Sequence, residues 1–299
     1  MLNRIGDFAQ SERMTSELLQ TQTRTRLTQA QISSGKVSDR FQDIAPEVER
    51  LIDVKQVLQR NQQFQENITF TDKKLIAMES AVSGLFDVAN RAQTLAIQRT
   101  NDPNSTPGLI GPEFENLLDQ AVAFLNDDME GRYLFGGSQT ARKPVELDPA
   151  FTAFGSADDS YYQGDALVLS TRVDIDVEIT TTMSADLEGF RELIGGLRGL
   201  INGDVLDDDV VLENSLGLVH ESLSKIADYH SELGIRQSQM ERIDQGHIDA
   251  EIYLENRISE IEDVDITDAI TRLAEDQVIL ESAMATLARM NQLNLVDYL

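Results

Sequence analysis

The apolar positions of this chain recur mostly at three- and four-residue steps, the spacing of one face of a helix. The most regular series is Phe64, Ile68, Thr71, Leu75, Met78, Val82, Leu85, Ala89, Ala92 and Ala96. A continuous helix from Glu47 to Thr100 would be roughly 80 Å long at about 1.5 Å per residue. We interpret this series as a core that packs against helices of the same chain.

Further helices are predicted on both sides of this segment, over residues 10–33, 112–130, 185–202 and 208–260. Gly35 follows the first of them, and a glycine at that place suits a left-handed helix end. Pro46 precedes the long helix, at a position that favours a helix start. The Asn101–Gly108 segment is rich in turn-forming residues and ends it.

The pattern changes between Gly131 and Thr182, where Gly, aromatic and β-branched residues cluster. Short strands are predicted at Tyr133–Phe135, Tyr161–Tyr162, Leu167–Leu169 and Val173–Ile179. In the last of these, apolar residues alternate with acidic ones, which is typical of a strand with one face in water. We therefore expect a small β-containing insertion.

Both chain ends carry an apolar seam. The last 35 residues place Ile266, Ile270, Leu273, Gln277, Leu280, Met284 and Leu287 on one helical stripe, and a Thr-rich seam runs from Leu18 to Ile32. A lone amphipathic helix is marginal in water, so each seam needs a partner. The seams could form a core within the chain. We favour contacts between subunits, made by Leu18, Ile32, Ile266, Ile270, Leu273, Leu280, Met284 and Leu287.

These elements predict a mainly α protein with an inserted small β region. Long antiparallel helices would form a rod-like bundle, and the termini would be coiled-coil helices. We divide the chain into an N-terminal assembly helix (1–40), the first half of the rod (41–130), an outward β-containing insertion (131–184), the second half of the rod (185–262) and a C-terminal assembly helix (263–299).

Charge and composition narrow the functional classes. The formal net charge of -27 repels nucleic acid and anionic lipid, so we expect neither as a partner. The absence of cysteine excludes disulfides and thiolate chemistry. We find no secretory leader and no apolar run of membrane-spanning length, so we expect no membrane insertion.

No motif predicts catalysis, a cofactor or a metal site. His220, His230 and His247 lack metal-ligand spacing, and we interpret them as exposed helix residues. The acidic run Asp207–Asp209 lacks the ligand pattern of a calcium loop and is interpreted as a helix cap or a solvated turn. We therefore expect a protein that is not an enzyme.

Five stretches resemble motifs of one family. They are Gln31–Lys36 (QISSGK), Gly131–Ser138 (GRYLFGGS), Tyr162–Asp165 (YQGD), Asp263–Asp265 (DVD) and Asn294–Leu299 (NLVDYL). Together, and in this order, they resemble the bacterial flagellin superfamily, and within it most the hook-filament junction proteins of the hook-associated protein 3 type. The turn that usually follows the first motif in this family is only partly present, because Ser38–Asp39 is kept and the proline is displaced to Pro46.

The resemblance implies a structural subunit at the junction between the flagellar hook and filament. Its partners would be further copies in a ring, the hook-side junction protein, flagellin, the flagellar export apparatus and a cytoplasmic export chaperone. It would be extracellular, exported by the type III route without a cleaved signal peptide, and its terminal helices would order on assembly.

Two alternatives stay open. The chain could be a flagellin, the bulk subunit of the filament, although the Tyr162–Asp165 and Asp297–Leu299 stretches favour a junction protein. It could also be a secreted acidic helical enzyme or effector, which we would expect to be a stable monomer with ordered ends.

Overall fold

The computed structural model describes residues 2–38, 47–101 and 106–296. Three predicted features lie wholly or partly outside these ranges: the helix start at Pro46, the turn between Asn101 and Gly108, and the chain-end motif. Within the ranges, the predicted class is confirmed, because long helices dominate and the strands form only two small sheets.

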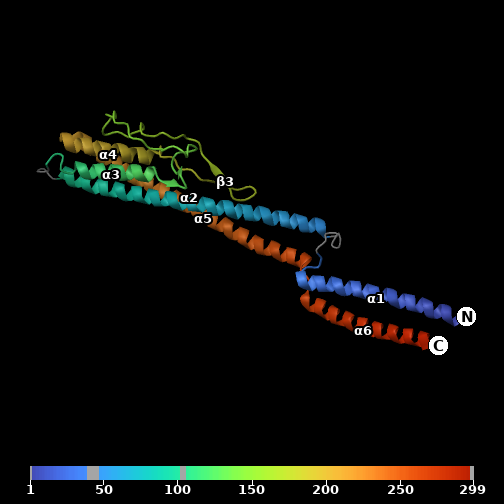
Figure 1. Ribbon diagram of the computed structural model, residues 1–299. Helices are drawn as coiled ribbons and strands as arrows, with labels where there is room; N and C mark the ends of the chain where they lie inside the picture. Colours follow the sequence, from blue (N-terminus) through green and yellow to red (C-terminus); the bar gives the residue numbers. More distant parts are fainter. Residues whose placement is uncertain (1, 39–46, 102–105, 297–299) are drawn as a thin grey trace. The chain divides into compact units, whose positions relative to one another are not determined.

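The helices are α1 (Leu2–Ser34), α2 (Val48–Asn101), α3 (Gly111–Leu125), α4 (Glu188–Leu206), α5 (Asp209–Glu262) and α6 (Ile266–Val296). Strands β1 (Asp128–Met129) and β2 (Arg132–Tyr133) form one antiparallel hairpin, and β3 (Ser170–Arg172) and β4 (Glu178–Thr180) form another. The chain divides into two units (Figure 1). One comprises Asn61–Asp249, which we name the helical body; the other comprises Met1–Arg60 with Ala250–Leu299.

In the helical body, α2 and α5 run antiparallel and side by side. Three pairs of partners mark this register: Asn61 with His247, Glu79 with Gln237, and Gln93 with His220. All ten positions of the series predicted from Phe64 to Ala96 are buried. The interpretation of this series as an internal core is therefore confirmed.

Helices α3 and α4 pack on each other and complete the core (Figure 1). Their fully buried side chains include Phe114, Leu125, Phe190, Leu193 and Ile194. Phe190 contacts Phe135 and Tyr229 edge to face, with ring centroids 6.2 Å and 5.2 Å away. These contacts fasten the segment after β2 and helix α5 to the same face of α4.

A buried ion pair joins the ends of three helices in the body. Asp204 of α4 is inaccessible to solvent, and its Oδ1 accepts a 2.6 Å hydrogen bond from Arg99 Nε of α2. Its Oδ2 accepts from the backbone N–H of Gly111 at 2.7 Å and of Ile110 at 3.2 Å. One carboxylate thus caps the start of α3, which lacks a cap from its own N-cap side chain.

Several predicted element boundaries are wrong. Of the predicted strands, Leu167–Leu169 is not a strand because β3 begins at Ser170, and only Tyr133 of Tyr133–Phe135 lies in a strand, β2. The first helix begins at Leu2 and not at residue 10.

Helix α3 ends at Leu125 and not at Glu130, because the Asn126 side chain pairs with the backbone of Val145 in both directions, at 3.0 Å. Helix α4 continues past Gly203 to Leu206. Gly203 allows close packing there, since an added Cβ would lie 2.9 Å from Leu212 Cγ of α5.

A further correction concerns Val173–Ile179, predicted as one strand. The chain reverses here: Val173 N–H donates to Val177 O at 3.0 Å, and Asp174 Oδ1 accepts from Ile175 N–H at 2.7 Å. Val173 and Ile179 are buried on the two arms of the hairpin, and Ile175 is exposed at its tip. The short polar turn therefore breaks the predicted strand into two arms, although the alternation of apolar and acidic residues runs through it.

Candidate assembly surface on the terminal helices

Helices α1 and α6 form an antiparallel pair, which we name the terminal pair (Figure 1). The residues they bury are small or polar: Thr21, Thr25 and Thr28 on α1, and Ala269 and Asp276 on α6. Each of the three threonine hydroxyls donates to a carbonyl four residues earlier in its own helix. The threonines therefore offer methyl groups to the partner helix and leave no hydroxyl unsatisfied.

Of the eight residues predicted to contact other subunits, five lie at the edge of this buried strip. Leu18, Ile32, Leu273, Leu280 and Leu287 are half-buried within the single chain. They share the helical face that α1 and α6 turn toward each other. Part of the predicted seam thus already packs inside the chain.

The other three predicted residues lie on a different strip of α6, which we name the outer stripe: Ile266, Ile270 and Met284. Their exposed fractions are 50%, 52% and 49%. At about 100° per residue, the outer stripe lies roughly a quarter turn around α6 from Ala269 and Asp276. The predicted single stripe is therefore split, because one antiparallel partner covers only one side of it.

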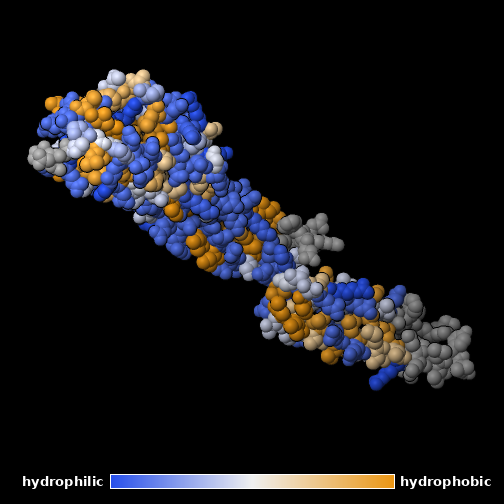
Figure 2. All heavy atoms as spheres, turned by 60° about the vertical axis from the view of Figure 1, so that its left-hand side comes forward, coloured by the Kyte–Doolittle hydropathy of each residue, from blue (hydrophilic) through white to orange (hydrophobic). Residues whose placement is uncertain are grey.

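Apolar side chains are also exposed elsewhere on the terminal pair. Leu19 and Leu27 on α1, and Val278 and Ile279 on α6, are each 48% to 66% exposed. Figure 2 shows hydrophobic side chains at the surface of this pair. A helix pair whose core is Thr and Ala and whose surface carries Leu, Ile and Val leaves much of its apolar area in water.

A buried carboxylate sets the register of the terminal pair. Asp276 is 3% exposed, and Arg24 Nε lies 2.8 Å and 2.9 Å from its two carboxylate oxygens. The Arg24 guanidinium holds the pKa of the Asp276 carboxyl below its ordinary value. Since a buried unpaired carboxylate is costly, any register that removes Arg24 is disfavoured.

Two of the resembling motifs meet where the terminal pair begins. Gly35 of QISSGK has a φ of 73° and ends α1 by donating to Gln31 O at 2.8 Å, as predicted. Its carbonyl accepts from Val264 N–H of the DVD motif at 2.9 Å. Val37 N–H donates to Glu262 O at 2.7 Å, so the end of α1 is fastened to the start of α6.

Two other motifs meet in the helical body. Gly137 of GRYLFGGS has a φ of 68°, and a Cβ there would lie 2.3 Å from the carbonyl oxygen of Asp165 in YQGD. Ser138 N–H donates to Asp165 Oδ1 at 2.7 Å. The Ser138 hydroxyl and amide lower the pKa of Asp165. The contacts between these motifs therefore stabilise the fold of the insertion, and the role of their residues is structural.

The histidines do not form a reactive site. His220 is exposed as predicted, whereas His230 is half-buried beside Glu79. The prediction is wrong for His247, which is 7% exposed because α5 turns it toward α2 and the β3–β4 hairpin. Its Nδ1 lies 2.5 Å from Asn61 Oδ1 and its Nε2 lies 2.7 Å from Val173 O.

Asp208 acts as the predicted helix cap, because its Oδ1 accepts from the backbone N–H groups of Val210 and Val211 at 3.0 Å and 3.2 Å. Within the described ranges, no group of three or more His, Asp or Glu side chains suits a metal ion. None of the helices in those ranges combines the length and apolarity that crossing a membrane requires.

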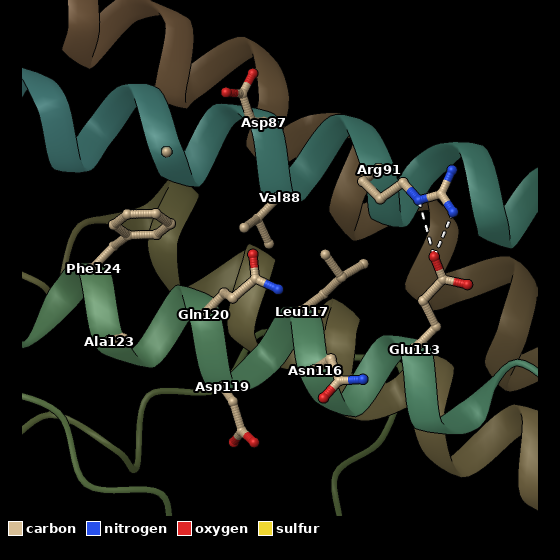
Figure 3. A pocket seen from close by; sticks show the side chains of 11 residues that line it. Asp87, Val88, Arg91, Glu113, Asn116, Leu117, Asp119, Gln120, Ala123 and Phe124 are labelled. Atoms are coloured by element: carbon tan, nitrogen blue, oxygen red, sulfur yellow. Dashed lines mark hydrogen bonds and ion pairs between the residues drawn. The ribbon is translucent and has the colours of Figure 1, made fainter.

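A groove of about 860 Å³ runs between α2 and α3 in the helical body (Figure 3). Its polar lining includes an ion pair in which Arg91 Nε lies 3.1 Å from Glu113 Oε1. At the other end, the Phe124 ring lies over Gly84, where an added Cβ would come within 2.5 Å of the ring. The groove holds carboxylates and amides but no nucleophile beside a base, so it offers no catalytic arrangement.

Comparisons with known proteins agree with this architecture. A profile of the bacterial flagellin N-terminal helical region matches residues 5–140, and a profile of the C-terminal helical region matches residues 216–299. The chain belongs to the bacterial flagellin family. The matched regions together include most of α1 and α5 and all of α2 and α6. Comparison with curated proteins gives no match.

Several solved structures share the fold. The crystal structure of FlgL from Bacillus cereus is 22% identical, with a TM-score of 0.58, and the alignment covers 69% of this chain and 98% of that one. Flagellar hook associated protein-3 from Legionella pneumophila is 16% identical with a TM-score of 0.60, covering 70% of this chain and 98% of that one. A flagellar junction protein FlgL from the same organism is 15% identical with a TM-score of 0.56, covering 71% and 99%.

Proposed function

We propose that this flagellin-family chain is a structural subunit of the bacterial flagellum that acts as an adaptor at the hook-filament junction. It would join the hook-side junction protein to the flagellin filament and would not be an enzyme. The outer stripe of α6 is the observation that carries this proposal, because it leaves apolar side chains in water on a helix that packs mainly against α1 among the described elements. The fold shared with FlgL proteins supports the junction position.

The mechanism is geometric. Further copies of the chain would cover the outer stripe and the exposed Leu19 and Leu27, so that a ring of subunits forms by burying apolar area. The strong negative charge of the chain opposes crowding of copies, so the buried area must offset this repulsion. The eight predicted contact residues and the five-segment division of the chain are parts of this proposal.

The proposal extends to location and route. The protein would lie outside the cell in the flagellum, exported by the flagellar apparatus without a cleaved signal peptide, with a cytoplasmic chaperone holding it beforehand. A terminal pair with a Thr-rich core is consistent with a segment that opens easily for transport.

The test separates folding from assembly. The change Ile270→Asp, or Met284→Asp, should leave the terminal pair intact in the monomer, because both side chains are about half exposed. We expect the same variants to fail to support filaments in a strain that lacks the native gene. Ile235→Asp on α5 is the matched control, since Ile235 is 66% exposed and lies in the helical body.

Normal filaments on both outer-stripe variants would refute the proposed contact surface. The alternative of a flagellin rests on the same two family profiles, and the abundance of the protein in filaments distinguishes it from an adaptor. A flagellin would dominate protein sheared from cells, whereas an adaptor would be scarce there and would label only at the filament base.

A further inference from the structure

A cavity of about 560 Å³ lies in the helical body, and none of its lining residues belongs to the terminal pair. Three elements enclose it: α2, the β1–β2 hairpin, and the arms of the β3–β4 hairpin with the residues beside them. Apolar side chains form part of its wall, including Phe70, Leu134 and Leu169. Hydroxyl groups of Thr140 and Thr171 and the cations Lys74 and Arg132 line the rest, with Glu130 as the acidic residue.

Lys74 is the unusual member of this wall. It is half-buried, and among the described residues no carboxylate forms an ion pair with it. Burial alone lowers the pKa of its ammonium group, with no acidic side chain offsetting the loss of water. Its neighbour Lys73 also lacks an ion pair but is exposed, so water solvates it. An uncompensated, partly desolvated cation is therefore placed at a cavity in a strongly acidic protein.

Thr71, one turn before Lys74 on α2, is a second and independent indication of a ligand site. It is 1% exposed, and its hydroxyl oxygen has no hydrogen-bond partner in the described part of the chain. Thr94 and Thr100, on the same helix, instead donate to carbonyls four residues earlier. A buried hydroxyl without a partner costs free energy, and rotation about one torsion can redirect it.

We propose that this cavity binds a small organic acid. The carboxylate would lie between Lys74 and Arg132, with the Thr71 and Thr171 hydroxyls as further donors. The apolar body of the ligand would pack against Phe70, Leu134 and Leu169.

The size and the lining favour this class of ligand. Ligand pockets commonly have volumes of roughly 300–1,000 Å³ and combine apolar walls with a few convergent polar groups. An inorganic anion would satisfy the cations but would leave the apolar wall in contact with water. A neutral apolar molecule would leave Lys74 uncompensated. The site is independent of subunit contacts on α6, so it can be tested on the isolated full-length chain.

The experiment uses phenylacetate as the probe, 2-phenylethanol as its uncharged counterpart, and inorganic phosphate as the anion without an apolar body. Isothermal calorimetry on the full-length chain measures affinity. We expect phenylacetate to bind, and Lys74→Gln to weaken it at least about tenfold through loss of a charge-assisted contact. Lys73→Gln is the matched control, because Lys73 is adjacent but does not line this cavity, and it should bind as the unmodified chain does.

A second measurement avoids any effect of substitution on folding. Reductive methylation of the unmodified chain, followed by peptide mass spectrometry, reports how reactive each lysine is. Phenylacetate should protect Lys74 in a saturable way and leave Lys73 unprotected. The proposal is overturned if phenylacetate protects both lysines equally, if it does not bind, or if phosphate or 2-phenylethanol binds as tightly.

Discussion

The helical body and the terminal pair follow the same three- and four-residue spacing, yet they bury different side chains. In the body, the spacing places Leu75, Met78 and Leu85 in a core that α3, α4 and α5 close. In the terminal pair, it places Thr25, Thr28 and Asp276 at the contact and leaves Ile266 and Ile270 in water. The body encloses a large apolar core within one chain, whereas the contact between α1 and α6 buries only small and polar side chains.

The difference between the two regions predicts which substitutions will destabilise the protein most. Asp204→Ala should cause the largest loss, about 3–5 kcal/mol, because it leaves the buried Arg99 without its partner and uncaps α3. Denaturant unfolding followed by circular dichroism measures this. Asp207→Ala is the control: its side chain is 60% exposed, and its loss should cost about 1 kcal/mol or less. Equal losses for the two variants would contradict a buried network at the helix ends.

A smaller and more local effect is expected in the terminal pair. Leu280→Asp places a carboxylate at the half-buried edge of the α1–α6 contact and should cost about 2 kcal/mol or more. Because a two-helix contact is marginal, amide protection in α1 and α6 should disappear while protection in the body persists. Hydrogen exchange by mass spectrometry resolves the two regions.

Val278→Asp supplies the control for that experiment. Val278 lies two residues away on α6 and is 66% exposed, so the pair should keep its protection. If the helical body of Leu280→Asp also lost its amide protection, the terminal pair and the helical body would unfold together, contrary to this prediction.

Acid should loosen the terminal pair by a further, smaller amount. Because Arg24 lowers the pKa of Asp276, the pair gains stability from this contact at pH values above the ordinary carboxyl range, near 4. That gain is lost as the pH falls through the lowered value. The protection factors of amides in α1 and α6, which are exchange rates relative to those of an unfolded chain at the same pH, should therefore fall at low pH, and Arg24→Gln should remove much of this dependence. An unchanged pH profile in the variant would rule out the ion pair as its source.

The smallest expected effect is a gain in the stability of the helical body. Burial, Asp244 and Glu241 raise the pKa of Asp72, so its ionisation costs stability that builds as the pH rises above the ordinary carboxyl pKa and is complete above the raised value. Asp72→Asn should stabilise the protein at pH 7 by less than about 1 kcal/mol, measured by thermal unfolding. Below the ordinary carboxyl range the variant and the unmodified chain should unfold alike, since both side chains are then neutral.

The helices and their buried faces were predictable because periodicity reports local geometry. The candidate contact surface was predictable only in part: one stripe was expected on α6, but it divides between Leu273 and Leu280, beside α1, and Ile266 and Ile270, in water. Which side of a wide apolar face a partner covers depends on the crossing of two helices, which spacing does not encode. The burial of His247 was missed for the same reason, since its partners are 186 and 74 residues away.

The sequence by itself determined the long helices, the glycine that ends α1, the family motifs and the acidic character of the chain, because each of these depends on neighbouring residues or on composition. Only the tertiary structure decided that Asp204 caps a helix from another segment, that GRYLFGGS and YQGD touch, and that Lys74 faces a cavity without a carboxylate. These are contacts between distant segments. They arise when helices and hairpins pack, and packing places side chains together without regard to their separation along the chain.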